Sequence, residues 1–177
     1  DKCVCFGTGF IVSEEGHILT NAHVIEGGYV YARTYDGTNY RVETIKSDRE
    51  LDLALVRLVS APKKFPVVRI GNSNKVKRGD QITVIGNPLG LRFEHSVFNG
   101  IINGINRKDG LLQVSVPTYG GISGSPVFDS NGRVIGVMAE VAPYVSSEYV
   151  KVKEEFVKQQ VEKGAINIGL AIPINYA

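Results

Sequence analysis

Two serines lie in a short stretch that is suited to covalent chemistry. Residues 119–126 read YGGISGSP, and half of these residues are glycine or proline, so the stretch cannot be the middle of a helix or of a regular strand. A serine hydroxyl attacks a carbonyl only when a base takes its proton, and the oxyanion that forms needs converging N–H donors. The backbone N–H groups of Gly121 and Ser123 can supply both donors. An ordinary glycine-rich turn between two strands is the alternative interpretation.

Three histidines are available as the base. His17 lies in a tight turn and His95 in a predicted strand, and structural roles are predicted for both. His23 follows a predicted strand and the residues Thr20, Asn21 and Ala22. It can therefore sit at a rim, where one ring nitrogen faces a reactant and the other meets a carboxylate.

Asp52 is the only carboxylate in the apolar run 51–58, which reads LDLALVRL. A buried, unpaired carboxylate is costly, so Asp52 lies at the start of the strand near solvent or has a partner. An acid that orients a histidine and stabilises its imidazolium has a reason to occupy such a position. His23, Asp52 and Ser123 therefore form a candidate catalytic set.

Short strands must position these residues. The alternation of apolar residues predicts one hairpin over 10–20, a helical turn holding His23, and a second hairpin over 29–47 that turns at Asp36 and Gly37. Further strands are predicted at 51–58, 81–86, 94–105, 111–116, 127–128, 134–141 and 168–172. So many short strands bounded by turn residues favour antiparallel barrels or a sandwich. One helix is predicted at 146–164, capped by Ser146 or Ser147 and closed by Gly164.

Composition excludes several classes of function. The 177 residues suffice for one large domain or two small ones, and 20 basic against 18 acidic side chains leave a net charge of +2 without long runs of one sign. Nothing indicates nucleic acid or an anionic membrane as a partner. No apolar run approaches the roughly 18 residues of a membrane span, and the first residues are not a secretion signal. Cys3 and Cys5 are interpreted as packing residues or incidental thiols, because no second Cys/His cluster exists for a metal.

The motifs, taken together in chain order, resemble the protease domain of the HtrA/Deg family, which belongs to the trypsin-like serine endopeptidases. They are GTGFIV at 7–12, ILTNAHV at 18–24, DLALV at 52–56, GISGSP at 121–126 and AIP at 171–173. The resemblance implies an all-β fold of two antiparallel six-stranded barrels with the active site between them. We expect a single domain over 1–177, with one barrel over about 1–65, the other over about 66–177, and the helix inserted near the C-terminus.

The resemblance also implies a role for each residue of the candidate set. His23 is the general base, Asp52 orients it and Ser123 is the nucleophile, while Gly121 and Ser123 supply the oxyanion N–H groups. Ser125 stands where the family usually has the second glycine of Gly-Asn-Ser-Gly-Gly. No metal or cofactor is expected. Unfolded or damaged polypeptide in protein quality control is the implied substrate, an extracytoplasmic compartment is favoured, and a homotrimer is possible.

By the same resemblance, two segments border the pocket for the substrate side chain. Thr118, Tyr119 and Gly120 form one wall. Ala139, Glu140 and Val141 form the other, where the backbone can pair with an extended substrate. The pocket residues are small or medium-sized, and no acid stands at the base as a lysine or arginine preference would need. We therefore expect a preference for small or medium apolar residues.

Three features depart from the family pattern. Ile122 stands where the family has Asn and trypsin has the Asp that pairs with a new N-terminus, so packing must hold this loop, and active and inactive arrangements stay open. The helix at 146–164 replaces a shorter loop, and it either gates the cleft or packs on the outside of the barrel. No PDZ module is expected within 177 residues. A protease-like peptide-binding module without turnover is the alternative function.

Overall fold

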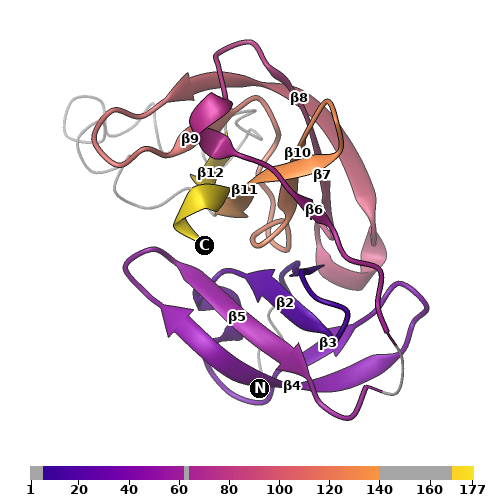
Figure 1. Ribbon diagram of the computed structural model, residues 1–177. Coiled ribbons are helices and arrows are strands. Elements are labelled where there is room, and N and C mark those ends of the chain that lie inside the picture. The colour runs from indigo at the N-terminus through magenta and orange to yellow at the C-terminus, as the bar shows by residue number, and fades with distance from the viewer. Residues whose placement is uncertain (1–5, 62–63, 140–168) are drawn as a thin grey trace, which may run out of the picture.

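A computed structural model of the chain describes residues 6–61, 64–139 and 169–177. In these ranges the regular structure consists of twelve strands and four short 3-10 turns. Figure 1 shows the strands in two groups, with the N-terminal strands below and the C-terminal strands above. Within the described ranges, no helix has the length and apolar character needed to cross a membrane.

The N-terminal group is an antiparallel sheet with the order β1-β2-β5-β4-β3. Its strands are β1 (Phe10–Ile11), β2 (His17–Thr20), β3 (Tyr31–Arg33), β4 (Asn39–Asp48) and β5 (Leu53–Leu58). Burial alternates along the central strand β5 from Ala54 to Leu58, because Val56 and Leu58 pack in a cluster with Ile18 and Phe65. The ends of β2 and β5 are fixed against each other by the pairing of Thr20 with Ala54.

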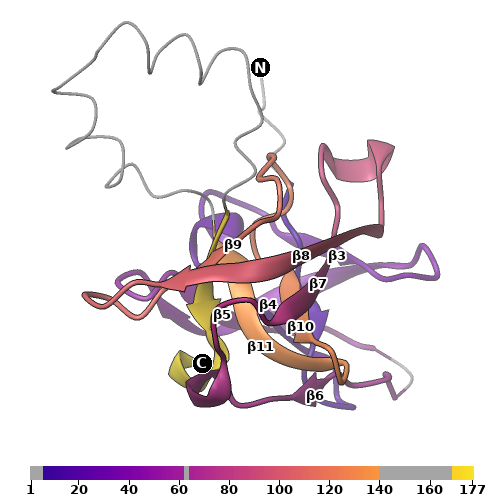
Figure 2. The same ribbon diagram turned by 90° about the horizontal axis from the view of Figure 1, so that it is seen from above.

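The C-terminal group closes into a barrel. Its six strands follow the order β10-β7-β8-β9-β12-β11, and β11 pairs back onto β10. Their bounds are β7 (Gln81–Gly86), β8 (Ser96–Ile105), β9 (Leu112–Val114), β10 (Pro126–Asp129), β11 (Arg133–Ala139) and β12 (Gly169–Pro173). A further strand, β6 (Arg69–Ile70), pairs in parallel with β11. From above, β8 spans the width of the barrel (Figure 2).

The predicted trypsin-like double-barrel class is confirmed, with two differences in detail. The C-terminal barrel has the expected six strands, whereas the described N-terminal residues form a five-stranded sheet that does not close on itself. Strand β6 was not predicted, because two residues are too few to show an alternating pattern. The predicted helix at 146–164 lies outside the described residues.

The 3-10 turns connect the strands. They are η1 (His23–Ile25), η2 (Ser73–Lys75), η3 (Gly90–Arg92) and η4 (Ile174–Tyr176). The first confirms the helical turn predicted to hold His23. The last follows β12 on the side of the barrel that faces the N-terminal sheet (Figure 1). Its Ile174 packs in a cluster with residues of that sheet.

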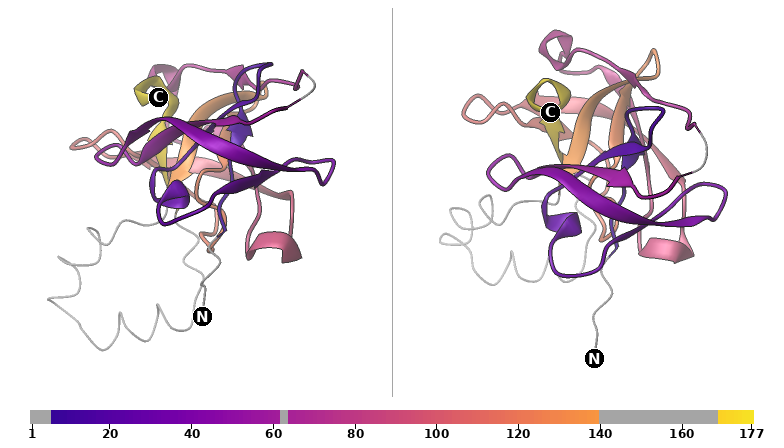
Figure 3. Two further views of the ribbon diagram at one scale, coloured as in Figure 1. Left: turned by 90° about the horizontal axis from the view of Figure 1, so that it is seen from below. Right: turned by 60° about the horizontal axis from the view of Figure 1, so that its bottom comes forward.

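The two sheets share part of their core. One buried cluster combines residues of the N-terminal sheet with residues of the C-terminal barrel and of η4: Phe10, Leu19, Leu53, Val134, Val137, Ile172 and Ile174. Seen from below, the N-terminal sheet lies across the barrel (Figure 3). The end of β2 and the segment that leads into β10 meet at this boundary, since a Cβ atom on Gly124 would overlap the hydroxyl of Thr20.

Candidate active site

His23 and Asp52 form a close pair on the N-terminal sheet. Nδ1 of His23 lies 2.8 Å from Oδ2 and 3.0 Å from Oδ1 of Asp52, and the backbone N–H of His23 donates to Oδ1 at 3.0 Å. A carboxylate only accepts hydrogen bonds, so Nδ1 carries the proton in this pair. In the neutral ring, Nε2 is then left with its lone pair, which is the tautomer that a general base requires.

The backbone around Asp52 fixes its carboxylate. Asp52 directly precedes β5 and has a φ of 51°, a left-handed conformation that aspartate tolerates better than most residues. The side-chain amide of the fully buried Asn21 donates to the Asp52 carbonyl at 2.9 Å. Asp52 was expected either to lie near solvent at the start of the strand or to have a partner. It does both, because about a third of its side chain is exposed and its carboxylate pairs with His23.

Ser123 lies in the connection between β9 and β10, where consecutive turns replace regular structure. The N–H of Ile122 donates to the Tyr119 carbonyl at 3.1 Å, and the N–H of Ser125 donates to the Ile122 carbonyl at 3.0 Å. Gly121 and Gly124 have φ values of 96° and 83°. A Cβ atom on Gly121 would overlap the Asn87 carbonyl, and one on Gly124 would overlap the Thr8 carbonyl. Only glycine fits at either position.

The hydrogen bonds of this connection leave two N–H groups unused. The Gly120 carbonyl accepts from the N–H of Leu89 at 2.7 Å, and the Ile122 carbonyl accepts from Ser125. The C=O and N–H of a trans peptide point in opposite directions, so the N–H groups of Gly121 and Ser123 point away from these donors. In the described part of the chain neither N–H has an acceptor. These are the two donors predicted for an oxyanion.

The two serines of the connection differ in their surroundings. Ser125 is fully buried, and its hydroxyl has no hydrogen-bond partner among the described residues. Ser123 is 5% exposed. No hydrogen bond joins Ser123 to His23 among the residues that the structure describes. Thr8 joins Ser123 to the end of β2, three residues before His23, because its N–H donates to the Ser123 carbonyl at 2.8 Å and its carbonyl accepts from the Thr20 hydroxyl at 2.6 Å.

Ile122 fills the core of the C-terminal barrel. It is almost completely buried in the cluster that contains Ile82, Val84 and Met138. This agrees with the expectation that packing, in the absence of an ion pair at this position, holds the connection.

The predicted pocket residues are described in part. Thr118 is partly buried, whereas Tyr119 and Gly120 are exposed. The methyl group of Thr118 lies 3.2 Å from the position of a Cβ atom on Gly169, and Ala139 pairs with the neighbouring Leu170, so Thr118 and Ala139 lie at the same end of β12. Glu140 and Val141 lie outside the described residues.

Residue patterns did not predict the polar residues that support this site. Thr8, Thr20, Asn21 and Asn87 were interpreted only as parts of motifs or turns. Thr8 donates to Gly121 and Asn21 to Asp52, whereas Thr20 and Asn87 both hydrogen-bond to Thr8. The one available signal was Thr8 between two glycines, where close backbone approach is expected. Among the described residues, no three His, Cys, Asp or Glu side chains gather where they can hold a metal ion.

Known proteins resemble the chain in sequence and in structure. The sequence model of one protein family, the trypsin-like peptidase domain, matches residues 7–137 of this chain. A probable periplasmic serine endoprotease, DegP-like, of Brucella suis is 32% identical over 96% of this chain and 35% of its own length. The corresponding protein of Halomonas elongata is 37% identical over 76% of this chain and 29% of its own. The chain thus spans about a third of the curated relatives that it matches.

The solved structure titled "HtrA-type protease AlgW with decapeptide" superposes with a TM-score of 0.76 at 27% identity. It covers 97% of this chain and 49% of its own. The similarity therefore includes both sheets and the connections that carry the candidate residues.

Proposed function

Because the chain belongs to the trypsin-like peptidases and is a protease domain of the HtrA/Deg family, we propose that it hydrolyses peptide bonds as a serine endopeptidase. Ser123 is the nucleophile, His23 the general base and Asp52 the acid that orients His23. The N–H groups of Gly121 and Ser123 form the oxyanion hole.

The observation that carries this proposal is the hydrogen-bond pattern around Ser123. Every N–H from Ile122 to Ser125 except that of Ser123 has a backbone acceptor, and the Gly121 N–H also has none in the described ranges. Two free N–H groups that flank one buried residue are what a developing oxyanion needs. An ordinary turn gives no reason for two neighbouring donors in a largely buried connection to lack acceptors.

The proposed reaction is acyl transfer in two halves. Nε2 of His23 takes the proton of the Ser123 hydroxyl as Oγ bonds to the substrate carbonyl carbon, and the carbonyl oxygen becomes an oxyanion held by the two N–H groups. The imidazolium, stabilised by Asp52, gives its proton to the leaving amine as the C–N bond breaks. Water then repeats these steps on the acyl-enzyme, which releases the carboxylic acid and restores Ser123.

Extended polypeptide with a small or medium apolar residue at the cleavage site is the proposed substrate. Thr118 and Ala139 support this preference, since both are short and lie at one end of β12. The AlgW relative is described with a decapeptide. The backbone of residues 139–141 is proposed to pair with the extended substrate as an added strand.

Protein quality control in an extracytoplasmic compartment is the proposed setting. The curated relatives are named periplasmic endoproteases. A homotrimer, which the family resemblance implies, stays a prediction that light scattering on the purified chain measures directly.

Cleavage of an unfolded, fluorophore-labelled protein tests the activity. We expect the chain to release peptides, and Ser123→Ala to lower kcat by at least about 10⁴-fold because the nucleophile is lost. Ser125→Ala is the matched control. We expect its kcat to stay within about two-fold, because in the part of the chain that the structure describes the buried hydroxyl has no hydrogen-bond partner to lose.

The peptide-binding module without turnover predicts a different result. The folded chain would then bind the unfolded protein tightly without cleaving it, and Ser123→Ala would change neither binding nor turnover. If Ser123→Ala cleaved the substrate at the same rate as the unaltered chain, the proposed mechanism would be wrong.

A further inference from the structure

The hydroxyl of Thr8 is a junction between three segments. Thr8 precedes β1 and is 7% exposed. Its Oγ1 lies 2.8 Å from the Gly121 carbonyl oxygen, 3.0 Å from the backbone nitrogen of Asn87 and 3.2 Å from the side-chain Nδ2 of Asn87. One donor and two acceptor sites are all that a hydroxyl offers, so its hydrogen-bonding capacity is fully used.

The direction of each hydrogen bond follows from its partners. The backbone N–H of His95 donates to Asn87 at 2.8 Å, so the receiving atom is the amide oxygen Oδ1, and Nδ2 is the end that faces Thr8. Both nitrogens of Asn87 donate, and the hydroxyl must accept from them. Its own hydrogen therefore points to the Gly121 carbonyl, which only accepts.

This hydrogen bond acts on the glycine that precedes Ile122. Gly121 lies between two peptide groups, and glycine lets both rotate at little steric cost. Leu89 holds the carbonyl of the first group and the Thr8 hydroxyl holds the carbonyl of the second. Asn87 and Leu89 both belong to the connection between β7 and β8. The burial of Ile122 fixes a side chain but does not fix the rotation of these peptides.

We propose that the Thr8 hydroxyl, oriented by Asn87, is a positioning residue that fixes the Gly121–Ile122 peptide. Together with Leu89, which holds the Gly120–Gly121 peptide, it thereby fixes the backbone torsions of Gly121, on which the direction of the Gly121 N–H toward the substrate oxyanion depends. The inference rests on the proposed function, because an oxyanion forms only if Ser123 is acylated. Thr8, in the N-terminal half of the chain, would thus help to position the Gly121 N–H in the C-terminal half. The neighbouring Ile122 has no charged group that could do this.

The steady-state kinetics of Thr8→Val test this role on an unfolded protein substrate. Valine keeps the shape of threonine but leaves the Gly121 carbonyl without its donor, and we expect kcat to fall about ten-fold with KM within about two-fold. Thr8→Ser keeps the hydroxyl and should stay within about three-fold of the unaltered chain. Thr83→Val is the matched control, because it removes a hydroxyl that bonds Asn99 on the outside of β7 and β8, and its kcat should not change.

Amide hydrogen exchange supplies a second measurement that needs no activity. The Ile122 N–H, which donates to Tyr119 across Gly121, should exchange about ten-fold faster in Thr8→Val and at the original rate in Thr8→Ser and Thr83→Val. If the unaltered chain shows no hydrolysis, the proposed function fails, and the exchange rates alone still decide whether Thr8 holds the connection.

Two results would overturn the proposal. One is a folded Thr8→Val chain whose kcat and Ile122 exchange rate match those of the unaltered chain. The other is a fall in the kcat of Thr8→Val that Thr8→Ser shows to the same extent. If Thr8→Val does not fold, Asn87→Ala removes the orienting amide from a partly exposed position. A kcat lowered about three-fold with faster Ile122 exchange supports the proposal, and unchanged values refute it.

Discussion

The carboxylate of Asp52 accepts hydrogen bonds from both the ring and the backbone of the same histidine. Two donors from one residue fix both the position and the orientation of the ring. Asp52 is itself held in place by the hydrogen bond from Asn21 and by its left-handed backbone conformation. The tautomer with the proton on Nδ1 and the lone pair on Nε2 therefore depends on a single side chain.

Asp52→Asn tests this dependence. The amide can present a donor to Nδ1, which then favours the tautomer with the proton on Nε2, and the ring no longer accepts the serine proton. We expect kcat to fall by about 10³- to 10⁴-fold with little change in KM. The measurement is steady-state hydrolysis of an unfolded protein, with circular dichroism as the check on folding. A loss smaller than about ten-fold would show that Asp52 does not set the tautomer.

At the scale of elements, strand β7 and the connection at 121–126 pack without spare volume. A Cβ atom on Gly86, the last residue of β7, would overlap the hydroxyl of Ser125. Without that hydroxyl the next neighbouring atoms, on Ile122 and Ser125, lie 3.3 Å away. The buried, unpaired hydroxyl of Ser125 is therefore compatible with the fold only because residue 86 has no side chain.

A double-mutant cycle checks this packing. We expect Gly86→Ala to lower the free energy of unfolding by about 2 kcal/mol through overpacking. Adding Ser125→Ala should recover at least half of that loss, because it removes the overlapping atom. Denaturant titration of the four chains gives the coupling. Additive effects of the two substitutions would mean that residues 86 and 125 do not meet.

Sequence predicted most of the elements because alternating apolar residues and glycine turns are local signals. The strands around His17–Thr20, Leu53–Leu58 and Gln81–Gly86 follow directly from such patterns. The pairing of β6 with β11 and the open N-terminal sheet depend on contacts between distant residues, which leave no period in the chain.

The candidate site was predictable to a similar extent. The sequence placed His23 just after a strand and Asp52 as the one acid in an apolar run. In the structure Nδ1 of His23 lies 2.8 Å from Oδ2 of Asp52. The hydrogen bonds of Thr8 and Asn87 join residues 79 and 113 positions apart in the chain, so nothing local marks them.

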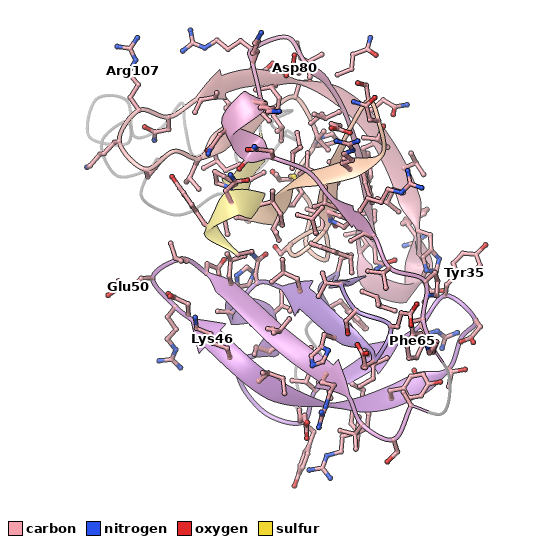
Figure 4. The ribbon with its side chains drawn as sticks, viewed as in Figure 1. Tyr35, Lys46, Glu50, Phe65, Asp80 and Arg107 are labelled. Atoms are coloured by element: carbon pink, nitrogen blue, oxygen red, sulfur yellow. The ribbon has the colours of Figure 1, made fainter. Side chains whose placement is uncertain are left out.

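The two sheets depend on each other for part of their core. The shared cluster contains residues from β1, β2 and β5 together with residues from β11, β12 and η4. Polar groups also cross this boundary, since Arg33 pairs with Glu94 at 3.3 Å and the ring of Tyr35 lies 4.8 Å from that of His95. Figure 4 shows Tyr35 at the side of the molecule where the two groups of strands meet.

A substitution in the shared cluster should therefore affect both sheets at once. We expect Ile172→Ala to lower the free energy of unfolding by about 2–4 kcal/mol and to shift one common transition, recorded by far-UV circular dichroism and by tyrosine fluorescence. Ile101→Ala, at an exposed position of β8, is the control and should cost less than about 1 kcal/mol. Two separate transitions, of which only one moves, would mean that the sheets are independent folding units.

An activated Ser123 should react with a serine-directed phosphonate, and labelling with this reagent is the decisive measurement. We expect one adduct per folded chain, located at Ser123 by mass spectrometry of the digested protein, absent from Ser123→Ala and retained in Ser125→Ala. Failure of the folded chain to form an adduct, or an adduct that persists in Ser123→Ala, would contradict the proposed role of Ser123.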